Sequence, residues 1–367
     1  MENLKYTEIL QGNKAMASKL TGKPYHIGVL ANVTISSFKE ILEYSCRTHQ
    51  VVPDVEIGNF DNIVQDSALY GNKEFVIIFY DVLNIVDSVS GFFEDLDDEA
   101  YTALKQKICS DIDITLGNLK SVPSVIFNTF SSAYFTPQYH QSSRIDRLVK
   151  ELNEYLEAKK TINVTLIDIN KIFCQTGLKQ NIDFRFYNSS KAPYTVAFFK
   201  HYVSAIEHTI LRNTGKLKKA IIFDCDNTLW KGIIGEDGID GIDMDKSSAT
   251  GRFYIKVQDI IIYLSKRGII VGVCSKNNEQ DVAEVFLNHQ HMILKDQHIV
   301  VKKINWQDKV TNLKAMAAEL NIGIDTFVFV DDSHFEINLI KEQLPEVLTL
   351  QVPENISEYP DFLLKNI

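Results

Sequence analysis

The sequence predicts an α/β protein built from two doubly wound parallel-sheet domains. Short apolar runs, such as residues 75–80 and 220–223, alternate along the chain with longer segments whose apolar residues have helical spacing. A continuous apolar run is typical of a strand buried on both faces of a parallel sheet, and the helices supply the crossovers that such a sheet needs. A charged stretch near the middle of the chain separates two such series.

The first half contains the elements of one sheet. A leading helix is expected at residues 4–20, and Ser36 and Ser37 are expected to cap the next helix. The elements that follow the leading helix are strand 26–31, helix 37–48, strand 51–57, strand 75–80, helix 99–119, strand 124–128, helix 142–159, strand 163–167 and helix 197–212.

The domain boundary is predicted in the charged stretch from Arg212 to Lys219. Gly215 suits the position just after a helix end, and lysines near the last turn suit the helix dipole. We therefore predict one domain over residues 1–215 and a second over residues 216–367.

The second half repeats the alternation of strands and helices. Residues 353–367 contain two prolines and are expected to pack irregularly. The elements before them are strand 220–223, helix 250–267, strand 269–274, helix 278–288, strand 299–302, helix 308–320, strand 326–330, helix 335–342 and strand 347–350.

Composition narrows the classes of function. The 367 residues carry a net charge of -10, which argues against a general nucleic-acid binder, because such proteins present a basic face. No apolar run approaches the length of a membrane span, and the first residues have no apolar signal core. The five cysteines are odd in number and dispersed, as in reduced proteins. We expect a cytoplasmic protein without a nucleic-acid or membrane partner.

The strongest chemical signal follows strand 220–223, where Asp224 and Asp226 stand one residue apart. An ionised carboxylate in apolar surroundings is costly without a partner, and open parallel sheets bind ligands at this end of their strands. A divalent cation or a phosphoryl group would be a suitable partner. A calcium loop is excluded, because it needs glycine and glutamate where this chain has Leu229 and Gly235. A turn with two solvated aspartates stays open as the alternative.

Polar residues also follow or begin three later elements. They are Ser275-Lys276-Asn277 after strand 269–274, Asp308-Lys309 at the start of helix 308–320, and Asp331-Asp332-Ser333 after strand 326–330. This ordered set resembles the motifs of the haloacid dehalogenase phosphatase superfamily. The tract from Asp224 to Gly232, followed by Gly235 to Gly238, is similar to the FkbH-like branch, subfamily IIIC. The resemblance covers roughly residues 216–352 and implies a Rossmannoid fold without a large cap.

This resemblance and the chemistry of phosphoryl transfer together assign roles to the aspartates. Asp224 would be the nucleophile that forms an aspartyl phosphate, and Asp226 the general acid and base. A nucleophilic carboxylate repels a phosphate dianion, so a Mg²⁺ ion is expected between them. The resemblance implies that Asp224, the Asp226 carbonyl and Asp331 bind this ion, with Asp332 acting through water.

The remaining motif residues are assigned to the phosphate. Ser275 and Lys309 would bind the phosphoryl oxygens, through a hydroxyl hydrogen bond and a compact positive charge. Thr228 is placed with this phosphate-binding group and could also hold Asp226, although local turn chemistry is the alternative. Lys276 and Asn277 are weaker candidates, because a basic residue and an asparagine are common at helix starts.

Spacing and resemblance also bear on the substrate. The stretches from Asp226 to Ser275 and from Ser275 to Lys309 are too short for a cap domain, so we expect an open site for a phosphorylated small molecule or a larger acceptor. Residues 232–238 are expected to form a mobile flap, or otherwise a pair of β-turns. FkbH-like proteins load a glyceryl group from a phosphorylated glycerate onto an acyl carrier protein, so the resemblance makes such a carrier an expected partner.

The first half resembles the SGNH-hydrolase-like domain that accompanies FkbH-like phosphatase domains. An active SGNH hydrolase carries a serine in a Gly-Asp-Ser motif after its first strand, where this chain reads Gly28-Val29-Leu30-Ala31-Asn32. The late Asp-x-x-His motif is also absent, and no pattern pairs Asp168 with His201. We therefore expect a binding or scaffold domain rather than an active hydrolase.

Two other functions compete with the phosphatase. A non-catalytic module that binds a metabolite or carrier protein is disfavoured, because a degenerate copy would lose at least one of Asp224, Asp226, Ser275, Lys309 and Asp331. A receiver-type signalling domain is disfavoured, because its phosphorylated aspartate ends a middle strand after an earlier acidic pair. A catalytic role for Cys225 or Cys274, which adjoin the predicted site, is the least favoured alternative.

Overall fold

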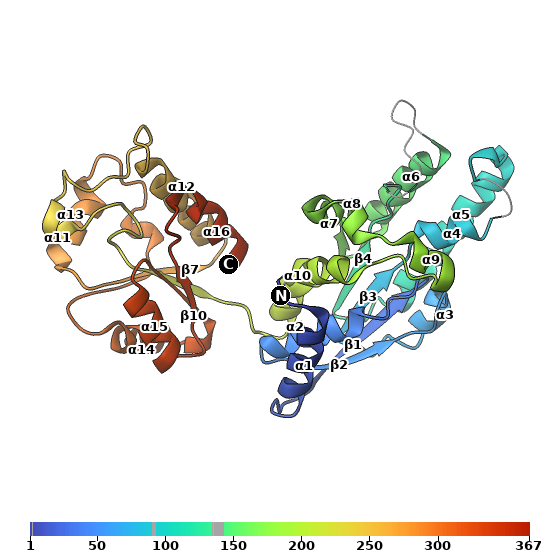
Figure 1. The fold of residues 1–367 in the computed structure, drawn as a ribbon, viewed down its shortest axis with the longest axis horizontal. Coiled ribbons are helices and arrows are strands. Elements are labelled where there is room, and N and C mark those ends of the chain that lie inside the picture. The colour runs from blue at the N-terminus through green and yellow to red at the C-terminus, as the bar shows by residue number, and fades with distance from the viewer. Residues whose placement is uncertain (2, 90–92, 134, 136–142) are drawn as a thin grey trace. The chain divides into compact units, whose positions relative to one another are not determined.

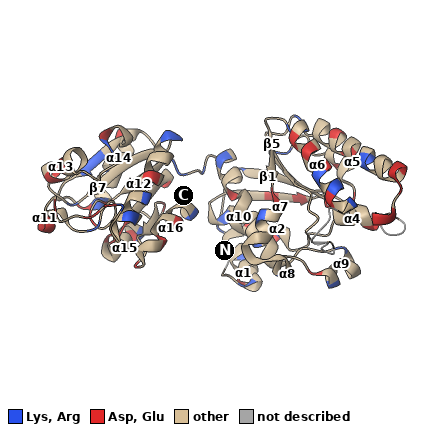
Figure 2. Ribbon diagram, turned by 90° about the horizontal axis from the view of Figure 1, so that it is seen from above, with Lys and Arg blue, Asp and Glu red and all other residues tan. Residues whose placement is uncertain are grey.

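The computed structural model describes residues 1, 3–89, 93–133, 135 and 143–367 (Figure 1). Contacts divide the chain into two compact units, Met1–Lys216 and Leu217–Ile367. Each unit contains one five-stranded sheet in which every pairing of neighbouring strands is parallel. The predicted α/β fold class, with two doubly wound parallel sheets, is therefore confirmed. Basic and acidic residues are interspersed along the helices of both units (Figure 2).

The first sheet has the strand order β2-β1-β3-β4-β5. The chain builds the sheet outward from β1 to β2 and then returns to the other side of β1, so the order reverses between β1 and β3. Every residue of β3 and β4 is buried, which explains the uninterrupted apolar sequence of β3 and the apolar centre of β4, between Ser124 and Asn128. The strands are β1 (Pro24–Ala31), β2 (Val52–Ile57), β3 (Phe75–Phe79), β4 (Ser124–Asn128) and β5 (Val164–Ile167).

Helices cover both faces of the first sheet. Helix α2 packs against both α1 and α10, while α5 packs against both α3 and α6. The helices are α1 (Tyr6–Ala17), α2 (Phe38–Thr48), α3 (Ile63–Ser67), α4 (Val82–Asp87), α5 (Asp98–Asn118), α6 (Arg144–Lys159), α7 (Ile169–Thr176), α8 (Leu178–Asn181), α9 (Phe184–Ser190) and α10 (Val196–Asn213), with a 3₁₀ turn η1 (Phe93–Asp95).

Two details of these helices differ from the sequence expectation. Ser37 occupies the N-cap of α2, but its side chain makes no capping hydrogen bond. Helices α3, α4, α7, α8 and α9 were not predicted, because four to eight residues are too few for a clear helical period. The predicted helix 142–159 corresponds to α6, and its first residue, Ser142, lies outside the described residues.

The end of α10 has the predicted glycine cap. Gly215 has a φ of 70°, in the left-handed region that favours glycine. Its amide donates to Arg212 O at 3.3 Å, and the Lys216 amide donates to Leu211 O at 2.8 Å. This pair of bonds is a Schellman motif, which satisfies carbonyls that the helix end would otherwise leave unpaired.

The second sheet has the order β10-β9-β6-β7-β8, with β6 at its centre. The order reverses between β6 and β9, so the switch point lies between these two strands. Ile221 and Phe223 point into one apolar cluster, while Ala220 and Ile222 point into another. The strands are β6 (Ala220–Phe223), β7 (Ile270–Ser275), β8 (Val301–Ile304), β9 (Phe327–Asp331) and β10 (Leu348–Gln351).

Each of these clusters lies beneath its own helices, with α12 and α16 on one face and α14 and α15 on the other (Figure 1). The helices are α11 (Ile234–Asp237), α12 (Gly251–Lys266), α13 (Glu279–Asn288), α14 (Lys309–Leu320), α15 (His334–Gln343) and α16 (Tyr359–Asn366), with 3₁₀ turns η2 (Asp296–His298), η3 (Ile324–Thr326) and η4 (Ile356–Glu358).

The end of the chain corrects one prediction. Residues 353–367 do not pack irregularly, because they contain η4 and α16, and α16 packs against α12. Pro360 lies in the first turn of α16, where a missing amide hydrogen costs no helical hydrogen bond. Tyr359 and Leu363 are fully buried, so tertiary packing holds this short helix.

Neither connection around β7 holds a cap domain. Between β6 and α12 the chain forms only the four-residue α11, and between β7 and β8 it forms α13 and η2. The second unit therefore has no large cap, as predicted. Among the described residues, no helix combines the length and the apolarity that crossing a membrane requires.

Candidate active site

Asp224, the predicted nucleophile, and Asp331, a predicted metal ligand, lie at the switch point of the second sheet. Asp224 directly follows β6 and Asp331 is the last residue of β9. The two strands are neighbours in register, with Phe223 beside Val330, and the Asp224 amide donates to Val330 O at 2.9 Å. Pairing of the strands therefore brings together two carboxylates that are far apart in the sequence, and both are buried.

Asp332 completes a cluster of three carboxylates. One carboxylate oxygen from each of Asp224, Asp331 and Asp332 lies within 4.8 Å of the others. Burial, and after it the Asp224 charge, raises the pKa of Asp331 to about 7 and also raises the pKa of Asp332. Because negative charges close together repel, binding of a cation would stabilise the ionised carboxylates. Carboxylate oxygens at this spacing are suitable ligands for a hard divalent ion.

Lys309 supplies the positive charge of this cluster. It is the first residue of α14 and is almost fully buried. Its Nζ lies 3.0 Å from Asp224 Oδ1 and donates to Asp331 Oδ2 at 2.6 Å. Burial alone would lower the pKa of the ammonium, but Asp224 and Asp331 together outweigh burial, so the pKa is raised. One ammonium among three carboxylates leaves the cluster short of positive charge when the carboxylates are ionised.

Asp226 lies beside this cluster and accepts three hydrogen bonds. Its Oδ1 accepts from Trp230 Nε1 and from the Ile234 amide, each at 3.0 Å. Its Oδ2 accepts from Asn277 Nδ2 at 2.8 Å. These donors fix the direction of the carboxylate, and two of them come from the segment that follows the aspartate in the chain.

The two predicted hydroxyl residues differ in their surroundings. Ser275 ends β7, is buried, and its Oγ accepts from Asn277 Nδ2 at 3.1 Å. Thr228 is fully buried, yet its hydroxyl has no hydrogen-bond partner among the described residues. The expected bond from Thr228 to Asp226 is therefore not formed.

Lys276, a weaker sequence candidate, is turned toward another acid. Its Nζ donates to Glu336 Oε1 at 2.6 Å. Lys276 directly follows β7, and Glu336 lies in the first turn of α15. Glu336 is buried, and its Oε2 has no hydrogen-bond partner in the described part of the chain. The structure places Lys276 in a part-buried ion pair that joins the end of β7 to α15.

Residues 232–238 contain a helical turn in place of the expected pair of β-turns, and their mobility as a flap stays a prediction. They contain α11, and Asp237 Oδ2 accepts from the Ile233 amide at 2.8 Å. The Gly232 amide donates to Asn227 Oδ1 at 3.0 Å, and Asn227 itself has a φ of 50°. Together with the bond from Ile234 to Asp226, these contacts tie a helical turn to the aspartate loop.

The two cysteines of this region are buried core thiols. Burial raises the pKa of Cys225 well above its usual value and raises that of Cys274 to about 12. The thiolate is the nucleophilic form of cysteine, and both residues are held in the neutral form. Neither thiol fits a catalytic role.

Sequence reasoning missed the donors that hold Asp226. The indole of Trp230 and the amide of Ile234 were not considered, and Asn277 was ranked low. Trp230 looked like an ordinary core residue, and an asparagine near a helix start usually caps it. In fact the next residue, Asn278, caps α13, which leaves the Asn277 side chain for the site.

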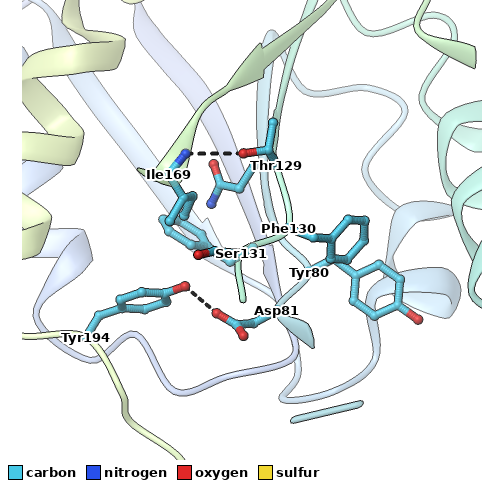
Figure 3. A pocket seen from close by; sticks show the side chains of 9 residues that line it. Tyr80, Asp81, Thr129, Phe130, Ser131, Ile169 and Tyr194 are labelled. Atoms are coloured by element: carbon cyan, nitrogen blue, oxygen red, sulfur yellow. Dashed lines mark hydrogen bonds between the residues drawn. The ribbon is translucent and has the colours of Figure 1, made fainter. Parts of the chain in front are cut away.

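The switch point of the first sheet is closed by its own side chains (Figure 3). Asp81 follows β3 and is buried; its Oδ2 accepts from the Tyr194 hydroxyl and its Oδ1 from the Leu83 amide. Asn32, which follows β1, exchanges two hydrogen bonds with the Asp81 backbone, at 2.7 and 2.8 Å. A cavity of about 10 Å³ is left there, room for about one water molecule.

The residues around this cavity are engaged in structural bonds. Ser131 Oγ donates to Asn170 Oδ1 at 2.7 Å. Thr129 Oγ1 accepts from the Ile169 amide at 3.2 Å, a bond drawn in Figure 3. Asp168 caps α7 through the Asn170 amide at 3.0 Å.

Fold and site thus define an α/β protein whose second sheet carries carboxylates, a lysine and a serine at its switch point. This set of groups suits a divalent cation together with an oxyanion. Residues 216–354, which contain the whole cluster, match the model of the family described as Acid Phosphatase. No curated protein matches the chain.

Three solved structures are similar to the chain to very different degrees. One is the N-terminal part of a Bacteroides fragilis protein, which contains a phosphatase domain and is complexed with Mg. It aligns with a TM-score of 0.80 and 23% identity, over 99% of this chain and 97% of that one. This likeness shows the fold. Two other structures are too distant for inference. A salicylyl-acyltransferase from a tetracycline biosynthetic pathway aligns with a TM-score of 0.33 and 14% identity, over 52% of this chain and 56% of that one. A lipase from a goat rumen metagenome aligns with a TM-score of 0.33 and 10% identity, over 49% of this chain and 96% of that one.

Proposed function

We propose that this protein is a Mg²⁺-dependent phosphatase that acts on phosphorylated small molecules and uses Asp224 as its nucleophile. The observation that carries the proposal is the cluster of buried Asp224 and Asp331 with half-buried Asp332, in which Lys309 lies between the first two. Support comes from the match of residues 216–354 to the acid phosphatase family, and from the likeness to a phosphatase-containing structure complexed with Mg.

In the first step, a carboxylate oxygen of Asp224 bonds to phosphorus while the bond from phosphorus to the leaving oxygen breaks. Lys309, held beside this carboxylate, and the Ser275 hydroxyl stabilise the charge on the phosphoryl oxygens. Asp226 gives its proton to the leaving oxygen, then takes a proton from the water that attacks the aspartyl phosphate. The second step releases phosphate and restores Asp224.

The acidic cluster fits the proposed metal. Asp224 and Asp331, with the Asp226 carbonyl, would hold Mg²⁺, and Asp332 would act through a bound water. When bound, the ion would neutralise charge on the phosphate as it approaches the carboxylates. Lys309 fills part of this electrostatic role, but a single ammonium does not balance three carboxylates.

The deciding experiment is a phosphatase screen of the full chain against phosphorylated metabolites with Mg²⁺. The Asp224→Asn variant, which keeps the side-chain volume, is the matched control. We expect turnover of at least one phosphate ester by the wild type, loss of that turnover with excess EDTA, and no turnover by the variant. Metal-independent turnover, or equal turnover by Asp224→Asn, would contradict the proposal.

The acyl carrier protein implied by the FkbH-like resemblance is a finer proposal. The absence of a large cap in the second unit supports an acceptor larger than water. Incubation with a phosphorylated glycerate and a carrier protein that bears its thiol arm should add a glyceryl mass to the carrier, as read by intact-protein mass spectrometry. Phosphate release without any addition to the carrier would leave the protein a simple phosphatase.

We also propose that the first unit is a binding domain without hydrolase activity of its own. Its switch point is filled by the contacts of Asp81, while a separate cavity of about 240 Å³ is lined by polar groups that include Asp61, Tyr80, Lys107 and Asp111. We expect no hydrolysis of aryl acetates by the Asp224→Asn variant. Esterase activity that survives in this variant would overturn this proposal.

A further inference from the structure

Asn277 lies where the proposed acid and the proposed phosphate-binding serine meet. It follows β7 by two residues and is only 5% exposed. Its Nδ2 donates to Asp226 Oδ2 at 2.8 Å and to Ser275 Oγ at 3.1 Å. An amide nitrogen carries two hydrogens, and this arrangement uses both of them.

The direction of the amide is fixed by chemistry. The reverse orientation would put Asn277 Oδ1 against the Asp226 carboxylate, which when ionised has only acceptors to offer. Two acceptors face to face repel, so the nitrogen faces Asp226 in the ionised state that this aspartate enters when it gives up its proton. No other residue type of this size offers two hydrogens from one atom at this position.

Asp226 is anchored unequally on its two oxygens. Oδ1 accepts two hydrogen bonds, from Trp230 and Ile234, whereas Oδ2 accepts only the bond from Asn277 among the described residues. Each carboxylate oxygen has about two lone-pair sites. Oδ2 therefore keeps a site for the proton that the leaving group needs, and Asn277 sets where that site points.

We propose that Asn277 is a positioning residue that orients Asp226 Oδ2 toward the leaving oxygen and orients the Ser275 hydroxyl toward the phosphate. This inference rests on the proposed phosphatase function. As the bond from phosphorus to the leaving oxygen breaks, the proton on Oδ2 passes to that oxygen, and Asp226 is left as the carboxylate. The Ser275 oxygen, occupied by the amide, is left with its own hydrogen to donate to the phosphoryl group.

The test compares leaving groups that need the proton with ones that do not. An alkyl phosphate expels a basic alkoxide unless it is protonated, while p-nitrophenyl phosphate expels a stable phenolate. With Asn277→Ala we expect kcat/KM to fall about 100-fold for the alkyl phosphate, the size of effect that a misplaced general acid produces. For p-nitrophenyl phosphate we expect a fall of less than about 5-fold, because its leaving group does not need the Asp226 proton and only the loss of the Ser275 contact affects the rate.

Matched variants separate positioning from folding. Asn277→Asp keeps the shape of the side chain and removes both amide hydrogens. Its kcat/KM for the alkyl phosphate should fall at least as far as that of Asn277→Ala. Asn278→Ala changes the exposed neighbour, which caps α13 through the Gln280 amide at 3.4 Å, and should leave the ratio between the two substrates unchanged. Fluorescence of the buried Trp230 checks that each variant is folded.

Equal losses on both substrates in a folded Asn277→Ala protein would overturn the inference and leave the phosphatase proposal standing, as would full activity in both Asn277 variants. A wild type that hydrolyses neither substrate with Mg²⁺, nor any phosphate in the metabolite screen, would overturn the phosphatase proposal and this inference with it.

Discussion

The carboxyl edges of the two sheets share a topology and differ in their electrostatics. Each edge contains a switch point, between β1 and β3 in the first unit and between β6 and β9 in the second. In the second unit, Asp224, Asp331 and Asp332 gather around the single ammonium of Lys309. In the first unit, the buried carboxylate of Asp81 accepts hydrogen bonds from groups of its own fold.

This difference shows that sheet topology provides a crevice but does not decide whether the crevice binds a ligand. Reversal of strand order opens a crevice at the carboxyl edge of any such sheet. Side chains then decide whether the crevice attracts a ligand. Neutral donors such as the Tyr194 hydroxyl satisfy a carboxylate within the fold, whereas crowded carboxylates lower their free energy by binding a cation.

The largest expected effect comes from making the same substitution, aspartate to asparagine, at the carboxyl edge of each sheet. Asp224→Asn should lower phosphatase turnover by at least about 10⁴-fold, because it removes the nucleophile. Asp81→Asn, the same change at the other edge, should leave turnover within about 3-fold of the wild type. Steady-state kinetics on one phosphate ester measures both. A large loss in folded Asp81→Asn would show that the first edge takes part in the reaction.

Asp226, the proposed acid and base, should behave differently from Asp224, the proposed nucleophile. In Asp226→Asn the nucleophile remains, so some phosphoenzyme should form and then break down slowly, because no base activates water. Rapid quenching with a ³²P-labelled substrate would detect the intermediate. Absence of labelled protein from this variant, together with residual activity equal to that of Asp224→Asn, would contradict the division of roles.

A smaller effect is expected on the stability of the metal-free protein as the pH changes. Because the pKa of Asp331 is raised to about 7, the folded metal-free protein binds a proton that the unfolded chain has already released above about pH 4. The stability contributed by this group is therefore complete below pH 4 and is lost as pH rises to about 7. Thermal unfolding in EDTA, followed by tryptophan fluorescence, should show this loss, since Trp230 and Trp306 both lie in the second unit.

Two comparisons sharpen the pH experiment. Asp331→Asn cannot ionise at this position, so its unfolding temperature should fall less between pH 5 and pH 8 than that of the wild type. Added Mg²⁺ should reverse the wild-type loss at pH 8. An identical pH dependence in the variant and the wild type would show that Asp331 is not the group responsible.

At the first edge the expected effect is on stability alone. Tyr194→Phe removes the hydroxyl that donates to Asp81 and should destabilise the first unit by about 1 to 3 kcal/mol. Far-UV circular dichroism should record a shifted unfolding transition that tryptophan fluorescence does not follow. Turnover should be unchanged, and a parallel loss of activity would break the contrast between the two edges.

The smallest expected effect is at Thr228, whose buried hydroxyl has no partner among the described residues. Thr228→Val keeps the shape of the side chain and should change stability by less than about 1 kcal/mol, because no hydrogen bond is lost. If the hydroxyl contacts phosphate, as the sequence predicted, KM should rise about 3-fold with kcat nearly constant. An unchanged KM would remove Thr228 from the phosphate-binding set.

Local sequence determined the fold class and the main residues of the candidate site. Short apolar runs specify strands such as β4, predicted at residues 124–128 and found there, because burial on both faces favours apolar side chains. Asp224, Lys309 and Asp331 were recognisable as an ordered set, because each stands at the end of a predicted strand or the start of a predicted helix; Lys309 alone would have looked like a solvated residue on a helix face. Their convergence follows from the parallel topology alone.

Tertiary structure decided which polar groups meet. Asn277 donates to a carboxylate 51 positions away, and Tyr194 to one 113 positions away, so no local pattern could reveal either pair. Packing likewise turned the last residues of the chain into α16 and closed the first switch point around Asp81. Hydrogen bonds and charges act over a few ångströms in space, and only the folded chain sets those distances.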